Sequence, residues 1–223
     1  MAIIYGVEAS PYVRKTLLAH QYKEAEYELK MTVPHTDDAD FKAASPFGKI
    51  PGYKTDDGFA FSDSSVIIAY LEKTNQHKPL YPSDVNDYAF ALWLEEFGDT
   101  KMMEATAGLY YQRIIGPMFF EHKTDPERVA ELTDELIPAV LDYVEQLLEK
   151  KPADQTWIVG NDLSVGELAI ATNLFNLQHA DFNLDENKWP LVVKFKKQLF
   201  ELEFVAKQLQ VEVAMFKEAF KQA

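Results

Sequence analysis

The pattern of hydrophobic positions changes near residue 80 of the chain. Before this point, short apolar segments of strand length are separated by turn-forming residues. After it, apolar positions recur over long stretches at the three- and four-residue spacing of an amphipathic helix. The sequence therefore predicts an α/β region followed by an all-helical region.

The first region predicts the element order β-α-β, then a linking segment, then β-β-α. We expect strands at residues 2–5, 26–31, 52–55 and 59–61 and a closing helix at about 64–72. The Asp57-Gly58 pair is a strong hairpin signal between the last two strands. Ser10 and Pro11 favour a helix start after the first strand, because serine is a good N-cap and proline a good first helical residue.

A segment rich in turn formers, residues 77–86, has the composition of a linker. We expect a first domain at residues 1–76 and an all-helical domain at 87–223. The helical stretches are expected at 88–120, 126–150, 164–178, 190–200 and 203–220. Pro138 lies inside the second of these stretches and predicts a kink.

The charge and the amino-acid composition exclude several kinds of partner. The formal net charge of the 223-residue chain is -14, and a field of this sign repels nucleic-acid phosphates. We therefore expect no nucleic-acid partner. A small anion remains compatible, because close contacts outweigh a field that is screened over about 8 Å in physiological salt.

The chain has no cysteine, which excludes disulfides, thiolate metal ligands and a catalytic thiol of its own. Any thiol chemistry must belong to the ligand, and we expect no metal. No apolar stretch approaches the roughly 18 residues needed to span a bilayer. We expect a cytoplasmic protein without a membrane partner.

Ser10 places a hydroxyl at the turn between the first strand and the first helix. It is either an N-cap alone or also a hydrogen-bond donor to a bound thiolate. Ionising a thiol at neutral pH requires its pKa of about 8.5 to fall by roughly two units, or about 2.7 kcal/mol. A helix N-terminus contributes about 0.3–1 kcal/mol, and a hydrogen bond to a charged group contributes roughly 1.5–3 kcal/mol. One serine at one helix end is therefore sufficient.

Two further motifs can hold a peptide-like ligand. Pro51 precedes a short strand, and the residues alone favour an ordinary trans bond; a cis bond would turn the backbone N–H and C=O of Ile50 outward to pair with a ligand. Asp63 and Ser64 are either helix caps or, with the helix N-terminal amides, a site for the amino and carboxylate groups of an α-amino acid.

Together these motifs resemble those of the cytosolic glutathione transferases, and the resemblance covers nearly the whole chain. The Ser10-Pro11-Tyr12 motif is similar to that of serine-type, bacterial-like members, whose serine activates the glutathione thiol. The resemblance implies a thioredoxin-like N-terminal domain, an all-α helical bundle at the C-terminus, glutathione as co-substrate and a homodimer.

The resemblance also implies roles for the other two motifs. Ile50-Pro51 is similar to the cis-proline signature of the family, whose preceding residue binds the cysteinyl backbone. Asp63-Ser64 resembles the acidic-Ser pair that holds the γ-glutamyl group, although many relatives have Glu in place of Asp. Lys49 is a candidate for the glycine carboxylate.

Other candidates have weaker patterns. His35 is a second candidate for the glycine carboxylate. Tyr5 lies where tyrosine-type members keep their activating phenol, and we interpret it as a core residue or as one that supports the site from behind without contacting the ligand. In the helical region, residues 163–169 resemble the family's Ser-x-x-Asp box, with Glu167 in place of Asp, and we interpret Ser164 and Glu167 as a capping box.

An apolar and aromatic stretch at residues 102–119 indicates either core packing or a pocket for an electrophile. The candidates for such a pocket are Met102 and Tyr110, with Tyr12 at its rim.

We expect a detoxifying glutathione transferase, in which Ser10 stabilises a thiolate that attacks a small hydrophobic electrophile or, as a side activity, a peroxide. One alternative is a non-catalytic interaction protein with this fold, as the stringent starvation proteins illustrate. Another is a ligandin-like carrier of apolar molecules. Glutathione affinity and turnover separate the three.

Overall fold

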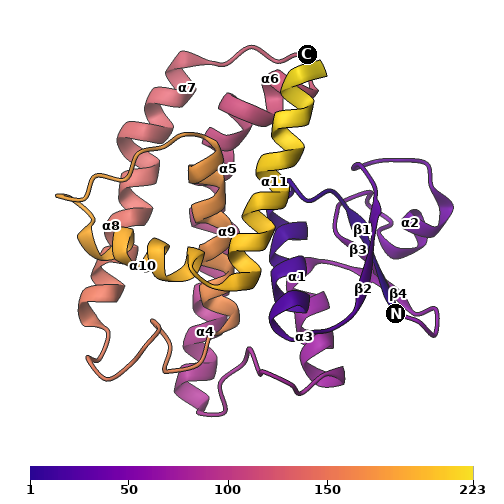
Figure 1. Ribbon diagram of the computed structural model, residues 1–223, viewed down its shortest axis with the longest axis horizontal. Coiled ribbons are helices and arrows are strands. Elements are labelled where there is room, and N and C mark those ends of the chain that lie inside the picture. The colour runs from indigo at the N-terminus through magenta and orange to yellow at the C-terminus, as the bar shows by residue number, and fades with distance from the viewer. Residues whose placement is uncertain (223) are drawn as a thin grey trace. The chain divides into compact units, whose positions relative to one another are not determined.

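The computed structural model describes residues 1–222, in two compact units, Met1–Tyr81 and Pro82–Ala223. The division falls inside the expected linker, residues 77–86. The first unit is α/β and the second is helical, so the fold class implied by the family resemblance is confirmed (Figure 1).

The first unit contains a four-stranded mixed sheet in the order β2-β1-β3-β4. Strand β1 is parallel to β2 and antiparallel to β3, and β3 is antiparallel to β4. The strands are β1 (Ala2–Gly6), β2 (Tyr27–Met31), β3 (Gly52–Lys54) and β4 (Ala60–Ser62). The helices are α1 (Pro11–Tyr22), α2 (Ala39–Ala44) and α3 (Ser64–Thr74).

The sequence pattern missed the short helix α2, although its N-cap leaves a signal. The Asp38 side chain accepts a hydrogen bond from the Phe41 N–H at 2.9 Å, as a helix-capping residue does. Phe41 and Ala44 from α2 pack with Tyr5 on one face of the sheet. Because side chains alternate along a strand, the neighbouring Ile4 enters the other core. That second core lies against the two longer helices and contains Ile4, Val13, Leu17, Tyr53 and Ile67.

The helical unit is built around α9 (Val165–His179), which is buried along nearly its whole length. The capping box predicted at its start is confirmed: Ser164 Oγ accepts from the Gly166 N–H, and Glu167 accepts from the Ser164 N–H. Its other helical segments are α4 (Val85–Phe97), η1 (Gly98–Met102), α5 (Met103–Tyr110), η2 (Tyr111–Ile115), α6 (Gly116–Phe119), α7 (Pro126–Glu131), η3 (Leu132–Leu136), α8 (Ile137–Lys150), α10 (Pro190–Phe200) and α11 (Glu203–Gln222).

The segments labelled η are π-helical turns inside longer helices. The turn η3 ends two residues before Pro138, where the sequence predicts a kink. Proline has no N–H to offer the carbonyl four residues earlier, which is that of Asp134 inside η3. The helix therefore widens its turn at the position where its regular hydrogen bond is missing.

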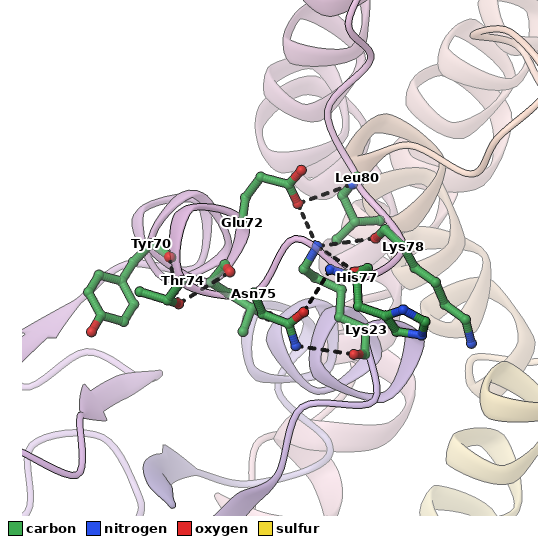
Figure 2. A network of polar contacts seen from close by, with 9 residues as sticks. Lys23, Tyr70, Glu72, Thr74, Asn75, His77, Lys78 and Leu80 are labelled. Atoms are coloured by element: carbon green, nitrogen blue, oxygen red, sulfur yellow. Dashed lines mark hydrogen bonds and ion pairs between the residues drawn. The ribbon is translucent and has the colours of Figure 1, made fainter.

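A buried lysine closes the first unit at its C-terminal end (Figure 2). The Lys23 ammonium donates to Glu72 Oε2 at 2.7 Å and to the carbonyls of His77 and Lys78 at 3.0 and 3.1 Å. The same Glu72 oxygen accepts from the Leu80 N–H at 3.2 Å. Lys23 thus joins the end of α1, the end of α3 and the segment that leaves α3.

Replacing this lysine by methionine (Lys23→Met) is expected to lower the free energy of unfolding by about 3–5 kcal/mol, because the largely buried Glu72 carboxylate and two carbonyls lose their donor. Lys78→Met is the matched control, since its ion pair with Glu24 is at the surface. Such a pair contributes only about 0–1 kcal/mol. Urea unfolding followed by circular dichroism measures both; equal losses would contradict the buried role of Lys23.

Candidate functional site

Three chain segments meet at one edge of the sheet because of its strand register. Gly52 pairs with Tyr5 on one side and with Ser62 on the other. Strands β1 and β4 both run antiparallel to β3, so their carboxyl ends lie at the edge where β3 begins. The turn that carries Ser10, the segment before β3 and the turn after β4 therefore share this edge. The sheet brings together all three motifs that the sequence singled out in the first unit.

Ser10 occupies the N-cap position of α1 without using its side chain there. Its carbonyl accepts the first helical hydrogen bond, from the Arg14 N–H at 2.8 Å. Its hydroxyl makes no capping hydrogen bond, and it has no partner among the described residues. Simple side-chain capping, one of the two roles left open by the sequence, does not account for this serine. The hydroxyl is available to a ligand at the positive end of the helix.

The peptide bond between Ile50 and Pro51 is cis, as the family resemblance implied and against what the residues alone favoured. Neither backbone polar group of Ile50 has a hydrogen-bond partner within residues 1–222. The backbone here is an open edge to which an extended peptide can bind as an added strand.

Two hydrogen bonds hold the segment before the cis proline. Ser45 Oγ donates to the Lys49 carbonyl at 2.6 Å, and the His35 N–H donates to the Gly48 carbonyl at 2.8 Å. Gly48 has a φ of 68° and a Cβ built on it would lie 2.7 Å from His35 Nδ1, so glycine is required. Lys49 and His35 are both exposed, and this backbone bond places them on neighbouring segments.

Asp63 and Ser64 begin helix α3 and divide two roles between them. Asp63 Oδ1 accepts from the N–H groups of Ser65 and Val66 at 3.0 and 3.2 Å, so the capping role of Asp63 is confirmed. Its other carboxylate oxygen and the Ser64 hydroxyl have no partner in the described part of the chain. These groups and the helix N-terminus can hold an amino group and a carboxylate.

The backbone of Asp63 is in an unusual conformation. Its φ is 84°, a region that L residues other than glycine rarely adopt. Such backbone strain costs about 1–3 kcal/mol and clusters at ligand-binding positions, where the surrounding structure maintains it. This conformation is a signal of function that the sequence does not carry.

A fully buried lysine connects the two helices that begin at the site. Lys15 Nζ donates to Ser65 Oγ at 3.0 Å, which ties the second turn of α1 to the first turn of α3. Both helix N-termini are therefore held at the same edge. The sequence analysis missed Lys15, because a lysine inside an amphipathic helix is normally assigned to its solvent face.

Tyr5 belongs to the core, as the sequence analysis interpreted it. It is 1% exposed and its ring centroid lies 6.1 Å from that of Phe41. Burial, with a smaller contribution from the carboxylate of Asp40, raises the pKa of the Tyr5 phenol above its ordinary value. The phenol is neutral at physiological pH.

The residues suggested for an electrophile pocket lie in different environments. Tyr12 is half-buried on the first turn of α1. Met102 and Tyr110 are 0% and 2% exposed, and the Tyr110 ring packs on His179 and Phe216 inside the helical unit. This burial favours the packing role that the sequence left open for them.

The edge of the sheet offers a consistent set of chemical groups. It has an unpaired backbone segment for a peptide, two helix N-termini for anionic groups, a carboxylate for an amine and a free hydroxyl beside one helix end. Among residues 1–222 no cluster of histidine, cysteine, aspartate or glutamate has the grouping of a metal site, and no helix there is long and apolar enough to cross a bilayer.

This geometry agrees with comparisons to known proteins. The model of the glutathione S-transferase N-terminal domain matches residues 4–79, and that of the C-terminal domain matches residues 111–211. The chain belongs to the glutathione transferase family. The serine, proline and acidic motifs at the sheet edge lie inside the matched N-terminal domain.

Relatives of this transferase-family chain carry different names. A glutathione S-transferase from Triticum aestivum is 26% identical over 193 residues, covering 85% of this chain and 84% of the relative. Elongation factor 1-gamma from Artemia salina is 25% identical over 198 residues, covering 83% of this chain but only 42% of the relative.

The fold also matches solved structures of the family. A glutathione S-transferase from Methylobacterium radiotolerans, in complex with glutathione sulfonate, superposes with a TM-score of 0.73 at 23% identity. The match covers 93% of this chain and 94% of that one. At this identity the likeness shows the shared fold.

Ser10→Ala is expected to change the free energy of unfolding by less than about 0.5 kcal/mol, because its hydroxyl makes no capping bond. Asp84→Ala is the comparison, since that side chain caps α4 by accepting from the Asn86 and Asp87 N–H groups. We expect it to cost about 1 kcal/mol. Urea unfolding of both variants is the measurement. A loss at Ser10 as large as at Asp84 would show that the serine acts as a structural cap.

Proposed function

We propose that the protein is a serine-type glutathione transferase that conjugates the glutathione thiol to small hydrophobic electrophiles. The observation that carries the proposal is the Ser10 hydroxyl, which stands at the N-terminus of α1 without a capping partner. Glutathione is the co-substrate. A twofold homodimer, as the family resemblance implies, is part of the proposal, and light scattering at micromolar protein concentration tests it.

In the proposed complex, the tripeptide lies extended along the open edge beside the cis proline. Its cysteinyl backbone pairs with the free N–H and C=O of Ile50. The γ-glutamyl amino group meets the free Asp63 oxygen, and its carboxylate meets Ser64 and the start of α3. The glycine carboxylate meets either Lys49, two residues before the cis proline Pro51, or His35.

The thiol then lies near Ser10. The hydroxyl donates a hydrogen bond to the sulfur, and the α1 N-terminus adds a favourable field. Together these supply roughly the 2.7 kcal/mol that a two-unit fall in thiol pKa requires. The thiolate attacks the electrophilic carbon, a C–S bond forms, and the leaving group departs with the electron pair of the broken bond.

The proposal specifies the second substrate only by its chemical class, which is small hydrophobic electrophiles. Reaction with peroxides is a side activity. Tyr12 lies two residues after Ser10 and is half-buried, which supports its place at the rim of the acceptor site. Met102 and Tyr110 are buried inside the helical unit, which favours their role in its packing.

A second candidate is a non-catalytic interaction protein, or an apolar carrier, with the same fold. The similarity of this chain to proteins named elongation factor 1-gamma supports this candidate. An interaction protein does not need glutathione affinity, and a carrier binds hydrophobic molecules without turnover.

Ser10→Ala is expected to lower kcat/KM for chlorodinitrobenzene by about 10- to 100-fold, the loss of one hydrogen bond to a charged sulfur. The pH midpoint of kcat/KM should rise toward about 8.5, the ordinary pKa of a thiol. Glutathione affinity, measured by calorimetric titration, should change by less than about threefold, because the tripeptide's other contacts remain. Ser83→Ala, the same change at an exposed serine, is the control and should alter none of these quantities.

Each result separates the candidates. If the wild-type protein does not bind glutathione at millimolar concentration, the transferase proposal fails and a search for protein partners replaces it. If the wild-type protein binds glutathione and turns over chlorodinitrobenzene, and Ser10→Ala has the same pH profile of kcat/KM as wild type, the family function stands. The proposed role of Ser10 is then wrong.

A further inference from the structure

Buried lysines join helices α1 and α3 at both ends of the pair. At the helix starts, Lys15 Nζ donates to Ser65 Oγ at 3.0 Å. At the far ends, Lys23 Nζ donates to Glu72 Oε2 at 2.7 Å (Figure 2). Lys15 and Lys23 are 0% and 1% exposed. Both links therefore belong to the folded interior, where a polar group that loses its partner is costly.

The two links show that α1 and α3 run side by side in the same direction. The step from Lys15 to Lys23 on α1 is eight residues, and the step from Ser65 to Glu72 on α3 is seven. At 1.5 Å per residue, these steps are about 12 and 10 Å along the two helices. Both helices also contribute side chains to one core. The starts of the two helices are thus held at a fixed offset.

The link at the helix starts lies between the groups that are proposed to bind two different parts of one ligand. Ser65 directly follows Ser64, and its N–H donates to Asp63 Oδ1 at 3.0 Å. Lys15 is on the second turn of α1, the helix that begins after Ser10. Ser10 is proposed to meet the thiol, and Asp63 with Ser64 the amino-acid head. The link therefore controls the distance between the thiol contact and the head contact.

The sheet sets this distance at a length that suits a γ-glutamyl thiol. Ser10 follows β1 and Asp63 follows β4, and β3 lies between these two strands. Two strand spacings of about 4.8 Å separate the contacts by roughly 10 Å. Two extended residues span about 7 Å, and a γ-linkage adds two carbon–carbon bonds to that path. If the separation is fixed, a thiol with a shorter or longer acidic side chain misses one of the two contacts.

We propose that Lys15 and Ser65 are positioning residues that make the site selective for γ-glutamyl thiols. Their hydrogen bond holds the start of α3 at one distance from the start of α1. A ligand binds well when its amino-acid head and its thiol match that distance, because the two contacts are preorganised. This inference rests on the proposed function, since it requires the peptide to lie along the sheet edge.

The test measures the affinity of the full-length protein for three tripeptides by calorimetric titration. They are glutathione, its β-aspartyl homologue with one methylene fewer and its δ-aminoadipyl homologue with one methylene more. All three keep the same amino-acid head, cysteine and glycine. We expect wild type to bind glutathione about 10-fold more tightly than either homologue, which corresponds to the loss of one hydrogen bond to a charged group.

Ser65→Ala and Lys15→Met each remove the link. Each is expected to weaken glutathione about fivefold and to leave the two homologues unchanged, so that the preference falls to about twofold. Circular dichroism checks that each variant is folded at the temperature of the titration. Should Lys15→Met not fold, Ser65→Ala decides the test, because it removes only one hydroxyl.

Two matched variants serve as controls. Ser65→Thr keeps a hydroxyl that can accept from Lys15 and should keep the wild-type preference. Lys23→Met breaks the link at the far ends of the same helices. It should lower stability and still keep the wild-type preference, which separates general loosening of the helix pair from a change in spacing at the site.

The outcomes separate this inference from the proposed function. If wild type does not bind glutathione at millimolar concentration, the proposed function fails and the inference fails with it. If wild type binds all three tripeptides equally well, or if Ser65→Ala keeps the wild-type preference, the inference alone is overturned. It is also overturned if Lys23→Met lowers the preference as much as Ser65→Ala does.

Discussion

The site depends on one constraint of strand register: Gly52 lies opposite both Tyr5 and Ser62. A slip of one residue in either pairing would exchange the two faces of a strand and place Ile4 where Tyr5 now packs. It would also separate the turn after β1 from the turn after β4. The register is held by the two cores, because Ile4 and Tyr53 are buried on one face and Tyr5 on the other.

The helix starts at this edge show how residues of similar cap-forming type take different roles. Asp63 uses one carboxylate oxygen to cap α3, and it does so with a φ of 84°. Ser10 stands at the same position of α1 with an ordinary φ of -73° and an unused hydroxyl. Strain is therefore concentrated at the residue whose free oxygen is proposed to meet an amine. The serine remains free to donate to a ligand.

The acidity of the chain does not conflict with a site for an anionic peptide. The net charge of -14 is spread along the sequence and is screened by salt. Two helix N-termini, fastened to each other through Lys15 and Ser65, can offer amides to an anionic group. Short-range donors of fixed direction decide such binding, because they lose little to screening.

How far the sequence predicts this protein depends on whether each signal is local. Short apolar segments between turn-forming residues identified the strands, and Ser164 with Glu167 identified the capping box, because both patterns lie within a few positions. Helix α2 was missed because six residues do not establish a helical period. The buried position of Lys15 depends on its contact with Ser65, 50 residues further along the chain, which no local pattern records. The φ of Asp63 is a backbone feature for which the residue type gives no signal.

The same distinction between local and long-range signals applies to the role of Ser10. As a residue type, serine before proline predicts a helix start, and it predicts this equally well for a cap and for a thiolate donor. The two roles differ only in where the hydroxyl hydrogen bond goes. In the structure it goes to no group of residues 1–222, while Asp38, Asp63, Asp84 and Asp125 all cap their helices with side-chain oxygens. This helix start leaves its hydroxyl available for the thiolate proposed above, in a chain that caps other helices with aspartate.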